Sequence, residues 1–204
     1  MSPNPERPPL PVLLIVNGYA ASGKTTLARA LSRELRWPLV VKDEFKELLF
    51  DRLGAADYKE SKRLGAAAID VMFSVARELL VAGTSVIIES PLIPSFDNPR
   101  IRPLERDADF LTVQVVLTGD PDVLFERYRS RAERGERHPS HFDHDRFSDM
   151  HAMLHSPFES LTVTGETLYF DTSRLSDEAI AEMQRRIVAV IDALSVTTDP
   201  RSGE

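Results

Sequence analysis

The chain has 204 residues, contains no cysteine and carries a formal net charge of −7 at pH 7. The length suits one compact domain, and the lack of cysteine excludes disulfides, thiolate metal sites and a cysteine nucleophile. The lack of cysteine also fits a reducing cytoplasm, so we expect a cytoplasmic single domain over residues 1–204. No apolar run approaches the about 20 residues that span a bilayer, so no membrane partner is expected. The acidic balance disfavours nucleic acid as a partner.

Apolar runs alternate with segments of helical periodicity along the whole chain. A proline-rich leader over residues 1–10 and a polar tail over residues 197–204 are expected to be disordered. Expected strands cover residues 12–17, 39–41, 85–89, 111–117 and 168–171, and expected helices cover 24–36, 44–53, 60–82, 120–133 and a last segment capped by Ser176. The prolines of residues 90–102 predict a loop there. The core stripe of the long helix is predicted as Leu64, Ala68, Val71, Met72, Val75 and Leu79.

Strands that alternate with helices predict a parallel sheet with right-handed crossovers. Active sites of such sheets lie at the carboxyl ends of the strands. This rule selects Gly18, Asp43, Glu89, residues 119–120 and residues 171–173, which are also the polar interruptions after apolar runs.

The first strand leads directly into a phosphate-binding loop pattern, Gly18-Tyr-Ala-Ala-Ser-Gly23-Lys24-Thr25. The glycines allow the backbone N–H groups to approach a polyphosphate, and the helix that opens at Lys24 adds its positive dipole end. Lys24 can reach the β- and γ-phosphates, and the Thr25 hydroxyl can bind Mg²⁺. A strand–helix turn that binds nothing is the less favoured interpretation. The residues assigned to nucleotide binding here are Gly18, Ala21, Ser22, Gly23, Lys24, Thr25 and Thr26.

With Asp43 after the second strand and an arginine-rich segment after the fourth, this loop makes the chain resemble the small P-loop kinases. It is most similar to the chloramphenicol phosphotransferase-like group, an AAA-type group of small-molecule kinases, and more distantly to shikimate, gluconate and adenylate kinases. The resemblance covers residues 12–194. It implies the three-layer α/β sandwich of a P-loop NTPase with a five-stranded parallel sheet in adenylate kinase-like order. It also implies ATP and Mg²⁺ as cofactors, and a short arginine-rich lid at about residues 131–150.

Asp43 is the candidate catalytic residue for the acceptor. In kinases of this type an Asp at this place accepts the proton of the acceptor or orients its hydroxyl, which suits an ionised carboxylate. The alternative is an N-cap of the helix over 44–53, and one residue could do both. The adjacent Lys42 and Glu44 are expected to point elsewhere.

Glu89 closes the third strand, where P-loop enzymes place an acidic residue, usually Asp, near Mg²⁺ or its waters. It is assigned to the metal or to the acceptor, and a solvated strand end is the alternative. Arg100 and Arg102 could bind an anionic acceptor, although lone loop arginines are more often solvated.

The arginine-rich segment carries the expected lid residues. The resemblance implies Arg127 near the adenine, Arg131 near the phosphates with a catalytic role, Arg134 as a catalytic residue of the lid, and Arg137 in the lid towards the acceptor. A solvated helix end, paired with neighbouring glutamates, is the alternative.

Two further groups of residues receive weaker assignments. Residues Asp171, Thr172 and Ser173 end the fifth strand, where related kinases shape the adenine pocket. Five histidines lie between residues 138 and 155, and without flanking Cys or an HExxH pattern they are expected to be polar loop residues, not a structural zinc site.

The sequence therefore predicts an ATP- and Mg-dependent kinase that phosphorylates a hydroxyl of a small molecule, such as an antibiotic, sugar, nucleoside or metabolite. A polynucleotide 5′-hydroxyl kinase and a nucleotide-dependent ATPase or switch that binds a protein partner are the alternatives. The identity of the acceptor and the oligomeric state stay open.

Overall fold

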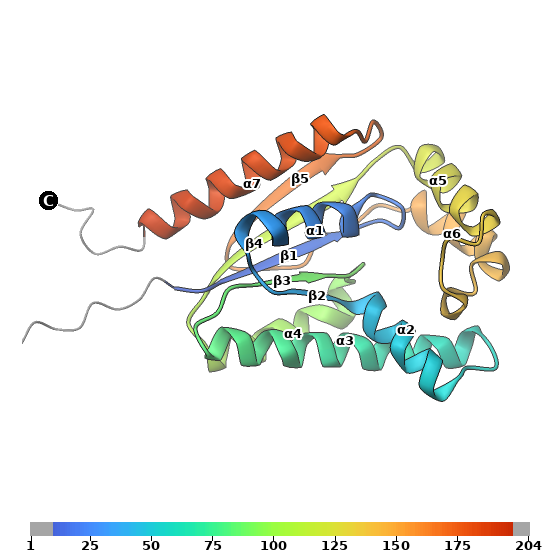
Figure 1. Cartoon of the computed structure of the whole chain (residues 1–204), viewed down its shortest axis with the longest axis horizontal. Coiled ribbons are helices and arrows are strands. Elements are labelled where there is room, and N and C mark those ends of the chain that lie inside the picture. The colour runs from blue at the N-terminus through green and yellow to red at the C-terminus, as the bar shows by residue number, and fades with distance from the viewer. Residues whose placement is uncertain (1–9, 198–204) are drawn as a thin grey trace, which may run out of the picture.

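The computed structural model describes residues 10–197, and they form one parallel five-stranded sheet with helices on both faces (Figure 1). The strand order is β2 (Leu39–Val41), β3 (Val86–Glu89), β1 (Val12–Gly18), β4 (Leu111–Thr118) and β5 (Glu166–Asp171). This confirms the predicted fold class and the adenylate kinase-like order. The predicted leader and tail lie outside the described residues, except that Leu10 is described and Thr197 ends the last helix.

The two faces of the central strand supply two separate cores. Successive side chains of β1 point to opposite faces, and all seven residues of the strand are buried. Leu14 and Val16 pack with α1 (Lys24–Leu35) and α7 (Asp177–Thr197), whereas Leu13 and Ile15 pack with α3 (Tyr58–Val81) and α4 (Pro94–Asp107). This double burial explains why the strand has a continuous apolar sequence.

The remaining elements gather at the carboxyl ends of the strands (Figure 1). They are α2 (Lys42–Leu53), α5 (Pro121–Glu133), the short 3-10 helices η1 (Pro139–His141) and η2 (Asp143–Arg146), and α6 (Phe147–Leu154). Leu124, Tyr128, Met150 and Leu154 form a small third core, against which Tyr19 and Ala21 of the phosphate-binding loop pack. Within residues 10–197, no helix is both long and apolar enough to cross a membrane.

The prediction of a loop over residues 90–102 is wrong, because α4 occupies most of it. Pro94 stands in the first helical turn, where its missing N–H is harmless, and the Asp97 carboxylate accepts a hydrogen bond from the Ile93 N–H at 2.7 Å. Ile101 and Leu104 are buried against α3 and the sheet. This apolar contact outweighs Pro99 and Pro103, which lie inside the helix and break its ladder of hydrogen bonds.

The predicted core stripe of α3 is partly wrong. Ala68 and Met72 are buried as expected, but Val71 and Val75 are 41% and 36% exposed. The buried face consists mainly of small side chains, because α3 packs closely against α2 and the sheet; its members are Ser61, Gly65, Ala68, Met72, Phe73, Ala76 and Leu80.

Candidate functional site

The phosphate-binding loop holds two glycines in conformations that other residues rarely adopt. Gly18 has φ +137°, and a Cβ there would lie 2.1 Å from the carbonyl oxygen of Leu117. Gly23 has φ +87°, and a Cβ there would lie 2.7 Å from Leu175 Cδ2. The Asn17 carboxamide fixes the start of the loop, because its Oδ1 accepts hydrogen bonds from the N–H groups of Gly18 (2.7 Å) and Leu92 (2.8 Å). The loop is therefore held in a tight turn that requires glycine at both positions.

The loop and the start of α1 form a site suited to an anion. Gly23 caps α1 without a side-chain hydrogen bond, and the first turn holds no acidic residue. The N–H groups of Gly23, Lys24 and Thr25 have no acceptor among residues 10–197. The ammonium of Lys24 bends back over the loop and donates to the Tyr19 carbonyl at 2.6 Å. A phosphate group would supply the missing acceptors.

Thr25 and Glu89 meet at the base of the loop. The Thr25 hydroxyl donates to Glu89 Oε2 at 2.8 Å, and Glu89 is 5% exposed. Burial raises the pKa of Glu89, and the charge of Lys24 and the Thr25 hydrogen bond oppose that shift. Hydroxyl and carboxylate oxygens are the ligands that Mg²⁺ prefers, so the two residues fit such an ion and would hold it. The alternative of a solvated strand end does not fit the burial of Glu89.

Asp43 lies in the first turn of α2 and does not cap it. The helix begins at Lys42, after Val41 as the cap, and no side chain makes a capping hydrogen bond. The cap interpretation of Asp43 is therefore wrong. Lys42 does not point elsewhere either, because its ammonium donates to Asp43 Oδ1 at 2.9 Å. Glu44 does point away and pairs with Arg29 at 3.0 Å.

The charge of Asp43 is set by its neighbours. Burial would raise the pKa of Asp43, but Lys42, His141 and Arg137 together hold it below its usual range. Asp43 is therefore an ionised carboxylate at neutral pH. Burial lowers the pKa of Lys24, and the charges of Glu89 and Asp43 oppose that shift. The ends of β1, β2 and β3 thus bring these three charged residues into mutual electrostatic range.

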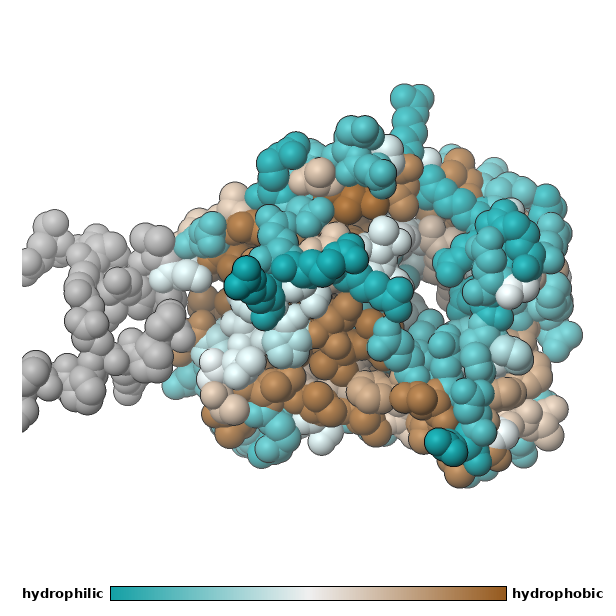
Figure 2. Space-filling view, in the orientation of Figure 1, coloured by the Kyte–Doolittle hydropathy of each residue, from teal (hydrophilic) through white to brown (hydrophobic). Residues whose placement is uncertain are grey.

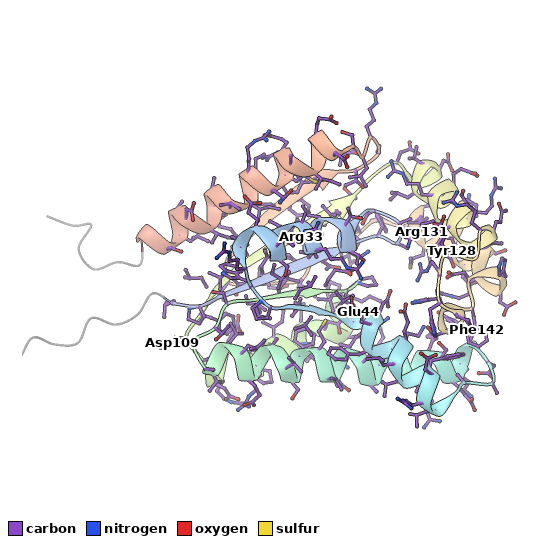
Figure 3. The ribbon with its side chains drawn as sticks, in the orientation of Figure 1. Arg33, Glu44, Asp109, Tyr128, Arg131 and Phe142 are labelled. Carbon is purple, nitrogen blue, oxygen red and sulfur yellow. The ribbon has the colours of Figure 1, made fainter. Side chains whose placement is uncertain are left out.

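The arginines of the segment after β4 divide into three kinds. Arg127 donates to the carbonyls of Thr172 (2.7 Å) and Ser173 (2.8 Å), which joins α5 to the end of β5. Arg131 and Arg134 are exposed and pair with Glu136, at 3.9 Å and 2.5 Å. Figure 3 shows Arg131 on α5, at the end of the sheet where α1 begins. In this conformation the two arginines form the solvated pairs that the alternative interpretation expects.

Arg137 lies between Asp43 and Asp143. It pairs with Asp143 at 3.0 Å and approaches Asp43 Oδ2 to 3.9 Å. Asp143 also accepts a hydrogen bond from the hydroxyl of Tyr128 at 2.7 Å. The structure therefore brings Arg137 to Asp43, as the assignment to the acceptor requires, through partners that the sequence did not single out.

The residues after β5 form a turn beside α5. The exposed Asp171 carboxylate accepts from the Ser173 N–H at 2.7 Å, and Thr172 is buried with its hydroxyl on the Thr118 carbonyl at 2.8 Å. Ser173 Oγ accepts from the Asp120 N–H at 2.7 Å. These contacts fix the turn over residues 171–173, whose carbonyl groups accept the hydrogen bonds from Arg127.

The segment with η1 is packed against α2 and α3. His138 contacts Asp51 at 3.1 Å, His141 contacts Glu47 at 2.9 Å, and the Ser61 hydroxyl donates to the Ser140 carbonyl. The expectation that the histidines are polar loop residues is wrong for His141, which is 6% exposed. Burial and the nearby Arg137 lower the pKa of His141 to about 3, so its ring is neutral.

One group of side chains in the described part of the chain has the spacing of metal ligands. Ligand atoms of Asp122, His151 and His155 lie within 4.8 Å of one another, and all three residues are exposed. The two histidines are four residues apart at the end of α6, and this spacing could have indicated the group from the sequence. We assign this group no role.

Together, the strand order, the glycine turn after β1 and the charged residues at the strand ends define the nucleotide-binding fold of the P-loop NTPases. A family model described as an AAA domain matches residues 13–157, and the chain belongs to this family of P-loop domains. No protein of curated function matches the sequence.

Solved structures of similar fold support this assignment. A protein of Chloroflexus aurantiacus J-10-fl, provisionally assigned as a kinase, is 34% identical, with a TM-score of 0.78 over 89% of this chain and 98% of that one. A sugar kinase from Janibacter sp. HTCC2649 is 19% identical, with a TM-score of 0.54 over 91% and 95%. A gluconokinase from Sinorhizobium meliloti 1021 is 17% identical, with a TM-score of 0.53 over 96% and 99%. The last two show the shared fold.

Proposed function

We propose that the protein is an ATP- and Mg-dependent kinase that transfers the γ-phosphoryl group to a hydroxyl of a small molecule. The observation that carries the proposal is the convergence of Lys24, Glu89 and Asp43 at the ends of three neighbouring strands. Lys24 belongs to the anion-binding loop, and Asp43, in the first turn of α2, is an ionised carboxylate. A nucleotide site and an acceptor site therefore share one edge of the sheet.

The residues divide the work of the transfer. Lys24 and the free N–H groups of the loop hold the phosphates, and Thr25 with Glu89 would hold Mg²⁺, which would supply neutralisation of phosphate charge. Asp43 accepts a hydrogen bond from the acceptor hydroxyl and takes its proton as the new O–P bond forms. The bond from the γ-phosphorus to the leaving oxygen breaks, and ADP carries away that negative charge.

Arginines complete the proposed site on the side of α5. Arg127, with the turn over residues 171–173, frames the adenine, and Arg131 and Arg134 exchange Glu136 for the phosphates when nucleotide binds. Arg137 lies against Asp43 and serves the acceptor. Charge neutralisation of this kind acts most strongly where water is excluded. The segment with η1, already packed on α2, provides part of that enclosure.

The comparison with the Chloroflexus protein supports phosphoryl transfer, since it covers almost the whole of both chains at 34% identity. No contact in the described part of the chain favours a polynucleotide acceptor or a protein partner. A switch would hydrolyse ATP without any acceptor, whereas a kinase requires the hydroxyl compound, and this difference separates the two functions.

The test is ADP release with Mg·ATP across a collection of hydroxylated compounds, measured for the parent and for Lys24→Ala. We expect release that depends on one class of acceptor and falls by at least a hundredfold in Lys24→Ala. Lys59→Ala is the matched control, because Lys59 is an exposed residue of α3. Equal ATP affinity in the parent and in Lys24→Ala would remove the basis of the proposal. ADP release that no acceptor stimulates would favour the ATPase.

A further inference from the structure

Lys46 is a buried cation that forms no direct ion pair with any residue that the structure describes. It lies on α2 and is 5% exposed, although it is a residue type that is almost never buried without a partner. Among residues 10–197, no hydrogen bond or ion pair reaches its ammonium. Burial, with the nearby charge of Lys42, lowers the pKa of Lys46 to about 8, and the charge of Asp43 opposes that shift.

The charged groups around Lys46 are already matched with one another. Lys42 pairs with Asp43 at 2.9 Å, Arg137 with Asp143 at 3.0 Å, and His141 with Glu47 at 2.9 Å. The guanidinium of Arg146 lies over the ring of Tyr58 at 4.2 Å. Asp43 and Asp143 each have a cationic partner, and Glu47 is hydrogen-bonded to the neutral ring of His141, so none of these three carboxylates forms an ion pair with Lys46.

Lys46 also stands in the right place to meet an acceptor. It follows Asp43 by three residues on α2, which puts both on one face about one turn, or ~5 Å, apart along the helix. Gly65 of α3 opposes it, and even a Cβ there would lie 3.8 Å from Lys46 Cδ and from the Lys42 ammonium. In the view of Figure 2, the surface of the molecule is hollowed between the sheet and the side of α5 and α6.

We infer that Lys46 binds an anionic group, a carboxylate or a phosphate, that the acceptor carries a few bonds away from its reacting hydroxyl. The inference rests on the proposed kinase function and narrows its substrate class. An unpaired buried ammonium is costly, and an acceptor that brings the missing negative charge offsets this cost when it binds. Asp43 then takes the hydroxyl end of the acceptor, and Lys46 takes the anionic end.

The variant Lys46→Met tests this without depending on turnover. Methionine fills similar space and removes the unpaired charge, so we expect the free variant to melt at the same temperature as the parent or higher. Lys59→Met is the control, because Lys59 is exposed. The probes are C3 to C7 hydroxycarboxylates, each with its primary amide, and glycerol 3-phosphate with glycerol. Each is titrated against protein loaded with Mg²⁺ and a non-hydrolysable ATP analogue, and binding is followed by the melting temperature.

We expect at least one anionic probe to stabilise the parent and Lys59→Met, with its Kd at least tenfold higher in Lys46→Met. Its neutral counterpart should bind weakly and alike to all three proteins. The carboxylate and phosphate probes decide which anion the site takes. Equal anion binding by the parent and Lys46→Met, or no anion binding by either, overturns the inference.

The two proposals fail in different ways. If only neutral compounds are phosphorylated and Lys46→Met keeps the parental rate, the kinase stands and the anion site falls. If anions bind through Lys46 but the protein shows no affinity for Mg·ATP, the anion site stands and the kinase falls.

Discussion

Asp43 has a cationic side chain beside each of its two carboxylate oxygens. Lys42 donates to one of its oxygens, and Arg137 lies 3.9 Å from the other. These charges keep Asp43 ionised, which makes it a weak base before the reaction begins. In the proposed reaction, Asp43 would then orient the acceptor hydroxyl and accept its proton late, when the oxygen already bonds to phosphorus.

The substitution Asp43→Asn separates this role from a structural one. We expect acceptor phosphorylation to fall ~10²–10⁴-fold, because the amide cannot take the proton. ATP affinity should barely change, since the loop and Thr25 are untouched. Steady-state kinetics with an identified acceptor, beside nucleotide titration, measure both effects. Glu44→Gln is the neighbouring control, because Glu44 is exposed and, among residues 10–197, forms an ion pair only with Arg29. Full activity in Asp43→Asn would falsify the catalytic assignment.

A second residue with a measurable consequence is His141. Its pKa is lowered from 6.5 to about 3 by burial and by Arg137, so the unfolded chain binds the proton more readily than the folded protein. Stability from this residue is therefore complete above pH 6.5 and falls as the pH drops towards 3. Between pH 7.5 and 5 the loss is on the order of 1–2 kcal/mol.

In His141→Gln, the loss of folding stability between pH 7.5 and 5 that His141 causes should disappear. Glutamine is chosen because its amide can still donate a hydrogen bond to Glu47. Urea unfolding of both proteins at pH 7.5 and 5 gives the comparison. His144→Gln, at an exposed position, should behave as the parent does. A parental loss of stability in His141→Gln would show that other groups cause it.

At the residue scale, strand-end reasoning found the core of the candidate site. Lys24, Thr25, Asp43 and Glu89 all follow apolar strands, and parallel strands bring their carboxyl ends to one edge. The same reasoning could not place Lys42 against Asp43 or bury Lys46. Their positions depend on α3 and on the segment with η1, which pack on α2 from distant parts of the chain.

At the scale of elements, the strands could be predicted from the sequence, whereas the helices α4 and α6 could not. Each strand of the sheet contains a run of at least three apolar residues. The prolines of α4 imitate a loop, and its buried face becomes visible only when α3 and the sheet cover it. The lid was expected from resemblance alone. In the structure, the second part of the segment expected to form this lid, from Arg137 to Phe147, packs on α2, α3 and α5 through hydrogen-bond, histidine and aromatic contacts.

This division of the lid predicts two behaviours in hydrogen exchange. Residues 137–147 should be protected without nucleotide, because buried contacts of Ser140, His141 and Asp143 hold them. Residues 131–136 should gain protection only with Mg·ATP, as Arg131 and Arg134 leave Glu136 for the phosphates. Exchange measured with and without nucleotide tests both parts. Lys24→Ala with ATP serves as the control and should show no gain. Unchanged exchange over 131–136 at saturating ATP would mean that these arginines stay a solvated helix end.

At the scale of the whole molecule, the proposed nucleotide site joins elements that pack in separate cores. The loop after β1 contacts the small core of α5 and α6, whereas Thr25 reaches Glu89 on β3. Arg127 of α5 holds the turn after β5. A ligand bound among these parts is in contact with elements far apart in the sequence, and its binding energy therefore stabilises the fold as a unit.

Mg·ATP should accordingly raise the melting temperature. A ligand at a hundred times its Kd adds about 2.7 kcal/mol, which for a chain of this size corresponds to about 5–10 °C. Chelation of Mg²⁺ should remove most of this gain, since Thr25 and Glu89 would lose the ion they hold. Thr25→Val should do the same with Mg²⁺ present, because it keeps the shape of the side chain but deletes the hydroxyl that donates to Glu89 at 2.8 Å. Lys59→Ala should melt with the full parental shift. A shift of equal size with and without Mg²⁺ would contradict the assignment of Mg²⁺ to Thr25 and Glu89. No shift in the parent would contradict the nucleotide site itself, because a ligand that binds only the folded state must stabilise that state.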